Sequence, residues 1–323
     1  MTKRFVALGI VVAIVAILWT GAWFAAATMA TSTVKSLETA DGVNNPRLTC
    51  GRFGIGGFPF GFDATCTDAA ITSGDDTVTL AGLKASVLVF NPFHVLAFAQ
   101  GPATYDDAYN GIRRRLDFAD AEASARLTGW RIGRVSVVIN EPVLTDTIVE
   151  DRPMGKAARA ELHLIDVPDK YDATAGLATL AEHVAITGLD APGIEIAGGN
   201  AVLDAEITNL PDDVRTYGDA DLLRRWQAGG GKLLIVSFKG QDDDTNFDTS
   251  GTLGLDSTGR VEGQIKINST GVVELVQDQI PQEVRGLLLG AQAADGSYSQ
   301  VLNIAAGVVL AGVLPAAVIP PVW

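Results

Sequence analysis

The chain has 323 residues and carries 38 Asp+Glu against 24 Lys+Arg, a formal net charge of −14. This acidic balance argues against nucleic acid as a partner, because phosphate binding needs clustered cations and the only dense cationic run is Arg113-Arg114-Arg115. A negative body is also repelled by anionic headgroups, so we expect membrane contact through an apolar segment and not through a basic surface.

The N-terminal stretch Phe5–Ala30 has no charge and directly follows Lys3 and Arg4. As a helix it would reach roughly 39 Å at about 1.5 Å per residue, more than the ~30 Å hydrocarbon core of a bilayer. We therefore predict a transmembrane signal anchor at residues 1–30 that contacts the inner membrane through residues 5–30.

The basic pair before this stretch should keep the N-terminus in the cytoplasm, which places everything after Ala30 on the far side of the membrane. This predicts a single-pass protein of the bacterial inner membrane whose C-terminal part, residues 31–323, is a periplasmic β-rich domain. Trp19 and Trp23 suit the outer interface of the bilayer. A cleavable signal peptide is the alternative, because residues such as Ala27 are small, although secretory apolar cores usually run only about 7–15 residues.

The two cysteines, Cys50 and Cys66, fall outside the predicted span, where disulfides persist. Gly57-Phe58-Pro59-Phe60 lies between them and is typical of a turn. A hairpin folded about this turn would bring the cysteines opposite one another, so we predict a structural disulfide worth on the order of 3 kcal/mol in the chain-entropy model. A redox pair would need Cys-x-x-Cys spacing, which is absent.

Period-2 alternation of apolar and polar residues dominates the rest of the chain, whereas helical periodicity is scarce. In the clearest case Phe247–Leu255 forms a hairpin with Arg260–Ile267. Six apolar residues of this hairpin should share one face and are candidate groove-lining residues: Phe247, Leu253, Leu255, Val261, Ile265 and Ile267. We predict a mainly β fold, in which an N-terminal transmembrane helix precedes a large, mostly antiparallel curved sheet or β-groove with a few short helices.

Two helical interruptions are expected. The first is Ala220–Ala228, which Gly229-Gly230-Gly231 should stop. The second is a pair of short amphipathic turns within Val272–Ala294, with Leu287 and Leu288 facing the core.

The uncharged stretch Ile304–Ile319 is open to two interpretations. It could be a second membrane segment, but it is short for a span and Pro315 interrupts it. We therefore expect an apolar strand or pair of strands buried on both faces.

Few groups suit catalysis. None of the three histidines lies in a recognisable hydrolase motif; His163 and His183 could be neighbours across strands, but zinc would need a third ligand. The acidic run 242–248 superficially suits calcium, yet Phe247 stands where an EF-hand loop needs Gly and Leu253 where it needs Glu. We predict no enzymatic activity, no catalytic residue, no metal site and no cofactor.

The chain combines the N-terminal anchor with the Gly57-Phe58-Pro59 hairpin, the run Trp226–Leu233 leading into Gly251–Gly263, and a Pro320-Pro321 ending. Together these features resemble an uncharacterised bacterial envelope family, catalogued as domain of unknown function twenty-one twenty-five, over most of residues 30–323. The helix-then-hairpin segment and the apolar proline-rich end are also similar to AsmA-like envelope proteins, whose anchored β-sheets curl into apolar grooves. What this wider resemblance implies is phospholipid handling between the two membranes.

Two functions are therefore expected. In the first, an inner-membrane-anchored periplasmic protein binds or passes lipid, with phospholipid as ligand, in an apolar β-groove and contributes to envelope lipid homeostasis. In the second, a non-catalytic envelope scaffold binds a protein partner or self-associates. Alternation looks the same whether the apolar face is open to a ligand or closed over a core, so the sequence leaves both open.

Overall fold

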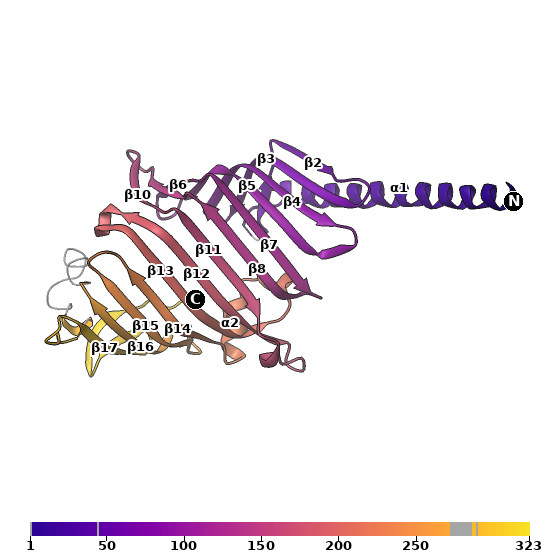
Figure 1. The fold of residues 1–323 in the computed structure, drawn as a ribbon. Helices are drawn as coiled ribbons and strands as arrows, with labels where there is room; N and C mark the ends of the chain where they lie inside the picture. The colour runs from indigo at the N-terminus through magenta and orange to yellow at the C-terminus, as the bar shows by residue number, and fades with distance from the viewer. Residues whose placement is uncertain (1, 44, 272–285, 289) are drawn as a thin grey trace. The chain divides into compact units, whose positions relative to one another are not determined.

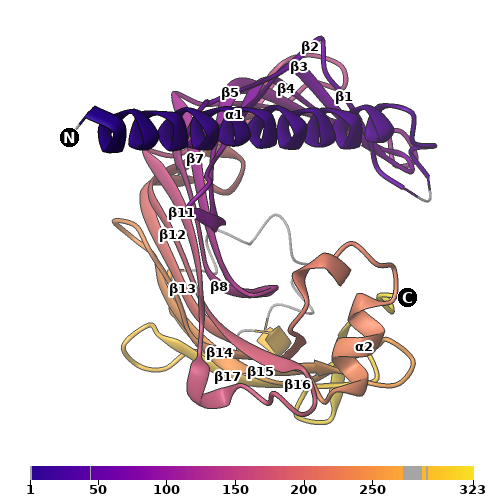
Figure 2. The ribbon, with the colours of Figure 1, turned by 90° about the vertical axis from the view of Figure 1, so that its right-hand side faces the viewer.

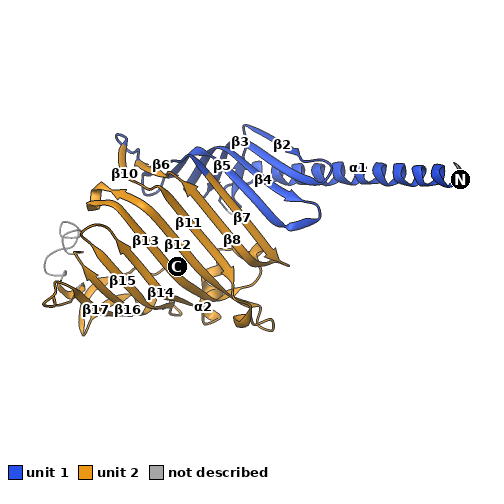
Figure 3. Cartoon of the chain, in the orientation of Figure 1, with its two compact units in different colours: residues 1–120, 146–151 blue, residues 121–145, 152–323 orange. Residues whose placement is uncertain are grey.

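The computed structural model describes residues 2–43, 45–271, 286–288 and 290–323 (Figure 1). The fold class is as predicted: the described chain is mainly antiparallel β, with one long apolar helix at the N-terminus and a few short helices. It divides into two compact units (Figure 3). Unit 1 comprises residues 1–120 and 146–151, and unit 2 comprises residues 121–145 and 152–323.

Unit 1 is a helix followed by an antiparallel meander in which β1 and β2 both pair with β3, and β3 to β6 pair consecutively. Its elements are α1 (Thr2–Glu38), β1 (Arg47–Thr49), β2 (Arg52–Gly56), β3 (Gly61–Ser73), β4 (Asp76–Leu88), β5 (Asn91–Asp107) and β6 (Ile112–Asp117).

Helix α1 continues past the predicted end of the span at Ala30 to Glu38. The apolar side chains of its first half are exposed, with Phe5 at 70% and Leu18 at 68%, whereas Trp23 is only 6% exposed. Among the described residues, α1 is the one helix whose length and composition would allow it to cross a membrane. Its long exposed apolar surface is typical of a segment that contacts a membrane or another apolar surface.

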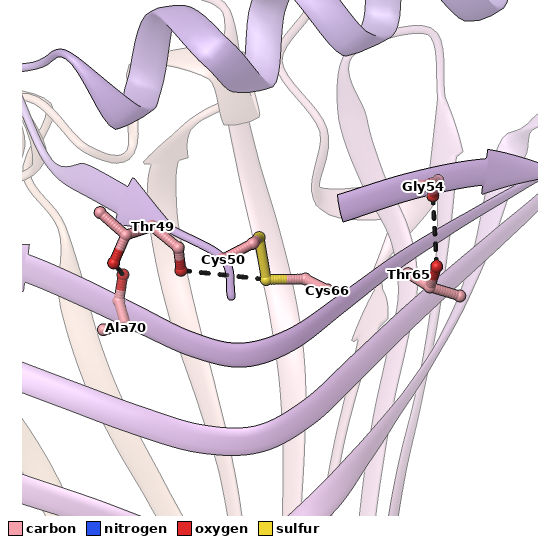
Figure 4. Close-up of a disulfide and its surroundings, with 6 residues drawn as sticks. All are labelled: Thr49, Cys50, Gly54, Thr65, Cys66 and Ala70. Atoms are coloured by element: carbon pink, nitrogen blue, oxygen red, sulfur yellow. Dashed lines mark hydrogen bonds between the residues drawn. A yellow bond between two sulfur atoms is a disulfide. The ribbon is translucent and has the colours of Figure 1, made fainter. Parts of the chain in front are cut away.

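The predicted disulfide is confirmed: Cys50 and Cys66 are bonded, with their Cα atoms 5.3 Å apart (Figure 4). The predicted register was wrong, however, because β3 places Cys66 opposite Phe53 and not opposite Cys50. Cys50 instead occupies the link between β1 and β2, two strands that pair with successive parts of β3. The disulfide therefore fastens the link between β1 and β2 to β3, the strand with which both β1 and β2 pair.

Unit 2 is built on a second antiparallel series, β8–β11–β12–β13–β14–β15–β16–β17–β18–β19, in which each strand pairs with the next named. Apart from single end residues, its elements are β7 (Asp120–Thr128), β8 (Arg131–Asn140), β9 (Val143–Asp146), β10 (Arg152–Lys156), β11 (Arg159–Asp166), η1 (Pro168–Lys170), β12 (Leu177–Ala191), η2 (Pro192–Ile194), β13 (Ile196–Pro211), η3 (Val214–Thr216), α2 (Leu222–Ala228), β14 (Lys232–Gln241), β15 (Asn246–Leu255), β16 (Val261–Thr270), β17 (Tyr298–Ala305), β18 (Val308–Ala311) and β19 (Leu314–Val318).

The sheet of unit 2 is curved, and α2 lies on its concave side (Figure 2). The predicted helix at Ala220–Ala228 is confirmed as α2, which packs through Trp226. The indole Nε1 of Trp226 donates to the carbonyl of Thr208 at 2.7 Å. A Cβ atom added to Gly231 would lie 2.1 Å from that nitrogen, so only glycine leaves room for the ring.

The stretch Ile304–Ile319 forms the end of β17, then β18 and β19, as the strand interpretation predicted. The prediction that it is buried on both faces was wrong. Val309 is buried, but Val313 is 90% exposed and Val318 is also exposed, because β18 buries only one face and β19 ends the series as its last strand. Most of the predicted turns in Val272–Ala294 fall outside the described residues; Leu287 and Leu288 are described and pack against the core, as expected.

Candidate functional site

One face of the unit 2 sheet is apolar across nine consecutive strands. Residues paired across antiparallel strands share a face, and side chains alternate along each strand. The register thus aligns Val137 with Leu162, Leu162 with Val184, and Val184 with Leu203. We call this surface, from β8 to β18, the apolar face.

The opposite face of the same strands is polar. Asp204 and Lys239, for example, stand between apolar-face residues on β13 and β14, and Lys239 pairs with Asp248 at 3.8 Å. This division matches a single-layer sheet with one wet face. The apolar face is the concave one. Helix α2 lies on the concave side, and its Trp226 ring covers the position where a Cβ atom of Gly231 would point. Gly231 is two residues before Leu233 and therefore faces the same side of the sheet, which is the apolar face.

The six candidate groove-lining residues are all on the apolar face, since Leu255 pairs with Val261 and the hairpin register has no shift. They do not share one environment. Four of them pack against the buried cluster of Leu302, Ile304, Val309 and Ala311: Leu253, Val261, Ile265 and Ile267. Together with Leu287 and Leu288 they form the main core of unit 2, which we call the packed section.

Phe247 lies on the same face but near the N-terminal end of β15, whereas Leu253 lies near its C-terminal end, and Phe247 is outside this cluster. Its ring covers Gly240 on the neighbouring strand, where an added Cβ would come within 2.2 Å of it, and it meets Phe238 edge to face at 4.9 Å. It also borders a cavity of about 690 Å³, whose other lining groups are mostly polar, such as Asn200 and Asp248. Leu255 likewise is not part of the buried cluster.

The remaining part of the apolar face, on β8 and β11–β13, lies outside the cluster that forms the packed section. Leu180 and Ala205 are among the residues buried there, and the others are half-buried. We call these half-buried residues the open section. Its residues are Val135, Val137, Ile139, Ala160, Leu162, Leu164, Val184, Ile186, Ala201 and Leu203. No described segment covers these side chains completely, so they present a continuous apolar surface.

One acidic residue, Glu182, lies within this apolar face. It stands opposite Leu164 on β11 and Ala205 on β13. In the described part of the chain it has neither a hydrogen bond nor an ion pair. Burial raises its pKa above the ordinary value, because an apolar setting disfavours the carboxylate.

Glu182→Gln is expected to stabilise unit 2 at neutral pH by less than about 1 kcal/mol. The pKa of Glu182 is higher in the folded protein than in the unfolded chain, where it is about 4.3. Glu182 therefore does not lower the free energy of unfolding below about pH 4.3, where it is protonated in both states. As pH rises through its folded-state pKa, the carboxylate forms and the protein loses stability. Thermal unfolding of the full chain in detergent micelles, at neutral and acidic pH, measures the difference. The exposed Glu122→Gln is the matched control and should show no such gain; an equal gain in both variants would contradict the assignment.

A polar group closes one end of the open section. Arg131 pairs with the buried Asp166 at 2.9 Å and stacks 3.9 Å over the ring of Tyr171. The Tyr171 hydroxyl donates to Asp212 at 2.9 Å, and this bond raises the tyrosine pKa above its ordinary value. The group is the polar boundary of an otherwise apolar surface.

The two histidines are neighbours across β11 and β12, as predicted, with ring centroids 6.1 Å apart. Each binds its own carboxylate: His163 contacts Glu161 at 3.0 Å, and His183 contacts Asp204 at 2.7 Å. They belong to the polar face, since the strand positions on either side of His183 belong to the apolar face. No group of three His, Cys, Asp or Glu is placed to hold a metal ion within the described ranges.

Sequence reasoning named the hairpin of β15 and β16 but not the open section. The signal was present, because the same alternation occurs in Ile132–Ile139 and Ala201–Thr208. What it could not indicate is which part of the face lies against a core. Glu182 was also missed, because its burial depends on residues of two other strands.

Comparison with known proteins gives a family. A family model described as "Uncharacterized protein conserved in bacteria (DUF2125)" matches residues 23–320. No curated protein matches the chain. The wider similarity to AsmA-like proteins is not shown by these comparisons and stays a prediction. Because the match runs from Trp23 in α1 to Pro320 beyond β19, the chain belongs to this family of bacterial proteins.

Proposed function

We propose that this protein is anchored in the bacterial inner membrane by α1 and binds phospholipid acyl chains on the apolar face of unit 2, in the periplasm, without catalysing a reaction. The observation that carries the proposal is the open section, a half-buried apolar surface that spans four strands on the concave side of a single-layer sheet. Each methylene that moves from water onto such a surface contributes about 0.8 kcal/mol. Headgroups can stay in water beyond the polar edge at Arg131 and Asp166.

Two observations support the periplasmic side. Lys3 and Arg4 precede the apolar part of α1, and basic residues favour the cytoplasmic end of a span. The Cys50–Cys66 disulfide suits an oxidising compartment on the other side.

A non-catalytic role agrees with the placement of the ionisable groups. His163 and His183 lie on the polar face, and each contacts a neighbouring carboxylate. Glu182, the carboxyl group that lies among the apolar-face residues, has no nucleophile or base among its cross-strand partners.

The test is photo-crosslinking from single positions of the full chain in bacterial membranes. A benzoylphenylalanine at Val184 faces the open section, whereas one at the adjacent Ala185 faces the polar side of the same strand and is equally half-buried. We expect lipid adducts at Val184 to exceed those at Ala185 several-fold when both proteins are analysed by mass spectrometry. Lipid that surrounds α1 is present in both proteins, so it does not contribute to the difference in adducts between the two positions.

Equal lipid adducts at the two positions would contradict the proposal. Adducts between Val184 and a protein would instead favour the envelope scaffold with a protein partner, and adducts between two copies of the chain would favour self-association.

A further inference from the structure

Unit 1 carries a second apolar surface, which is separate from the apolar face of unit 2. It is formed by the turn between β2 and β3 and the turn between β4 and β5. The two turns are neighbours, because Gly61 pairs with Leu88 and the amide of Val89 donates to the carbonyl of Phe60 at 2.9 Å. We call them the aromatic turns.

The aromatic turns expose large apolar side chains. Phe60 is 64% and Phe90 75% exposed, and Phe58 and Leu88 are about half exposed. Asp, Glu, Lys and Arg are absent from the sequence 57–62 around the first turn and from 85–105 around the second, where His94 is the one ionisable side chain besides Tyr105. A water-soluble surface rarely gathers such residues at the tips of hairpins.

The other ends of the same strands are charged. Asp75 and Asp76 lie at the turn between β3 and β4, and Asp106 pairs with Arg113 at 2.7 Å across β5 and β6. The sheet of unit 1 is therefore polarised along its strands, with apolar tips at one end and charged tips at the other.

Helix α1 is bonded to the apolar end. The indole of Trp19 donates to the carbonyl of Pro59 at 3.0 Å, and that of Trp23 to the carbonyl of Gly61 at 2.9 Å. Trp23 stacks on Phe62 with ring centroids 5.3 Å apart and also meets Phe58. In Figure 1 the N-terminal half of α1 extends beyond these turns, and its apolar side chains are exposed.

These contacts fix the height of the turns relative to a bilayer. A span of about 20 residues that begins at Phe5, next to the basic pair, ends near Phe24. At about 1.5 Å per residue, Trp19 and Trp23 then lie about 21 and 27 Å above Phe5, close to the outer boundary of the hydrocarbon core. The carbonyls that accept from these two indoles must lie at the same level.

We propose that the aromatic turns are a membrane-docking surface, in which Phe58, Phe60, Leu88 and Phe90 insert into the outer half of the same bilayer that α1 spans. Tryptophan and other aromatic side chains are favoured at this depth of a bilayer. The aromatic turns carry no Asp, Glu, Lys or Arg, so their insertion buries none of these charges. The inserted turns hold unit 1 against the membrane at a second point beside the helix. This inference rests on α1 as a membrane span but not on lipid binding by unit 2.

The test uses a fluorescent label whose emission reports polarity, attached to a single introduced cysteine in the full chain. The described cysteines are both in the disulfide, so a new thiol reacts alone. Phe90→Cys probes the aromatic turns, Asp75→Cys in the exposed charged turn is the matched control, and Ile10→Cys reports whether α1 itself is inserted. The proteins are reconstituted in phosphatidylcholine vesicles with or without lipids that carry a nitroxide quencher near the top of the acyl chain.

We expect the label at residue 90 to emit at shorter wavelength than the label at residue 75 and to be quenched by the nitroxide lipid at least about twofold more strongly. If residue 10 is quenched while residues 90 and 75 behave alike, the docking surface is refuted and the span stands. A short-wavelength emission at residue 90 without quenching by the lipid would also refute it, because the turns would then be buried against protein. Absence of quenching at residue 10 would refute the span and the docking surface together.

Discussion

Ile265→Asp is expected to lower the free energy of unfolding of unit 2 by about 3–5 kcal/mol. Ile265 stands opposite Leu302 in the packed section and contacts the buried cluster that Leu302 forms with Ile304 and the next strand. The substitution removes a branched apolar side chain from that core and leaves a carboxylate without a partner. Urea denaturation of the full chain in detergent micelles, followed by circular dichroism, gives the difference.

The matched control is Lys266→Asp, the next residue on the same strand, whose side chain points to the polar face. Its effect should stay within about 0.5 kcal/mol, as for most exposed substitutions. If Ile265→Asp unfolds at the same urea concentration as wild type, the apolar face is not closed at β16. The open section would then extend over the hairpin.

Removal of the disulfide by the double substitution Cys50→Ser and Cys66→Ser should cost about 3 kcal/mol of stability in unit 1. The bond joins residues 16 positions apart and therefore restricts the unfolded chain. Cys66 is also buried, so the serine hydroxyl adds a polar group to an apolar position. The measurement is the denaturant midpoint of the full chain in detergent micelles.

A control separates the bond from the side chains. Wild-type protein under reducing conditions should lose nearly the same stability as the double variant, because both lack the cross-link. An unchanged midpoint on reduction would mean that the disulfide does not contribute to the stability of unit 1. If only the double variant is weakened, the loss comes from packing around Cys66.

Local patterns explain most of what could be predicted about the fold. Alternation over five to ten residues reports that a strand has one wet face, because successive side chains point to opposite sides. This is why the hairpin of β15 and β16 and the face shared by Leu255 and Val261 could be anticipated. Likewise, the Gly229-Gly230-Gly231 run after Trp226 indicated where α2 ends.

Features that depend on partners distant in sequence could not be predicted. The pairing of Cys50 with Cys66 was inferred correctly, but its register was not, since β1 also pairs with β3 and displaces Cys50 from the hairpin. The C-terminal stretch was expected to be buried on both faces. Its last strand is exposed because it ends the series, a position that no local pattern reveals.

The β-rich domain and the one long apolar N-terminal helix before it follow from the amino-acid sequence, because charge distribution and side-chain period are local properties. How the apolar residues are used depends on the three-dimensional fold. The cross-strand register assembles nine strands into one apolar face, closes it at Ile265 against Leu302, and leaves it half-buried at Val184. The indole hydrogen bonds of Trp19 and Trp23 set α1 beside the aromatic turns. Both outcomes arise from contacts between residues far apart in the chain, which alternation alone leaves undetermined.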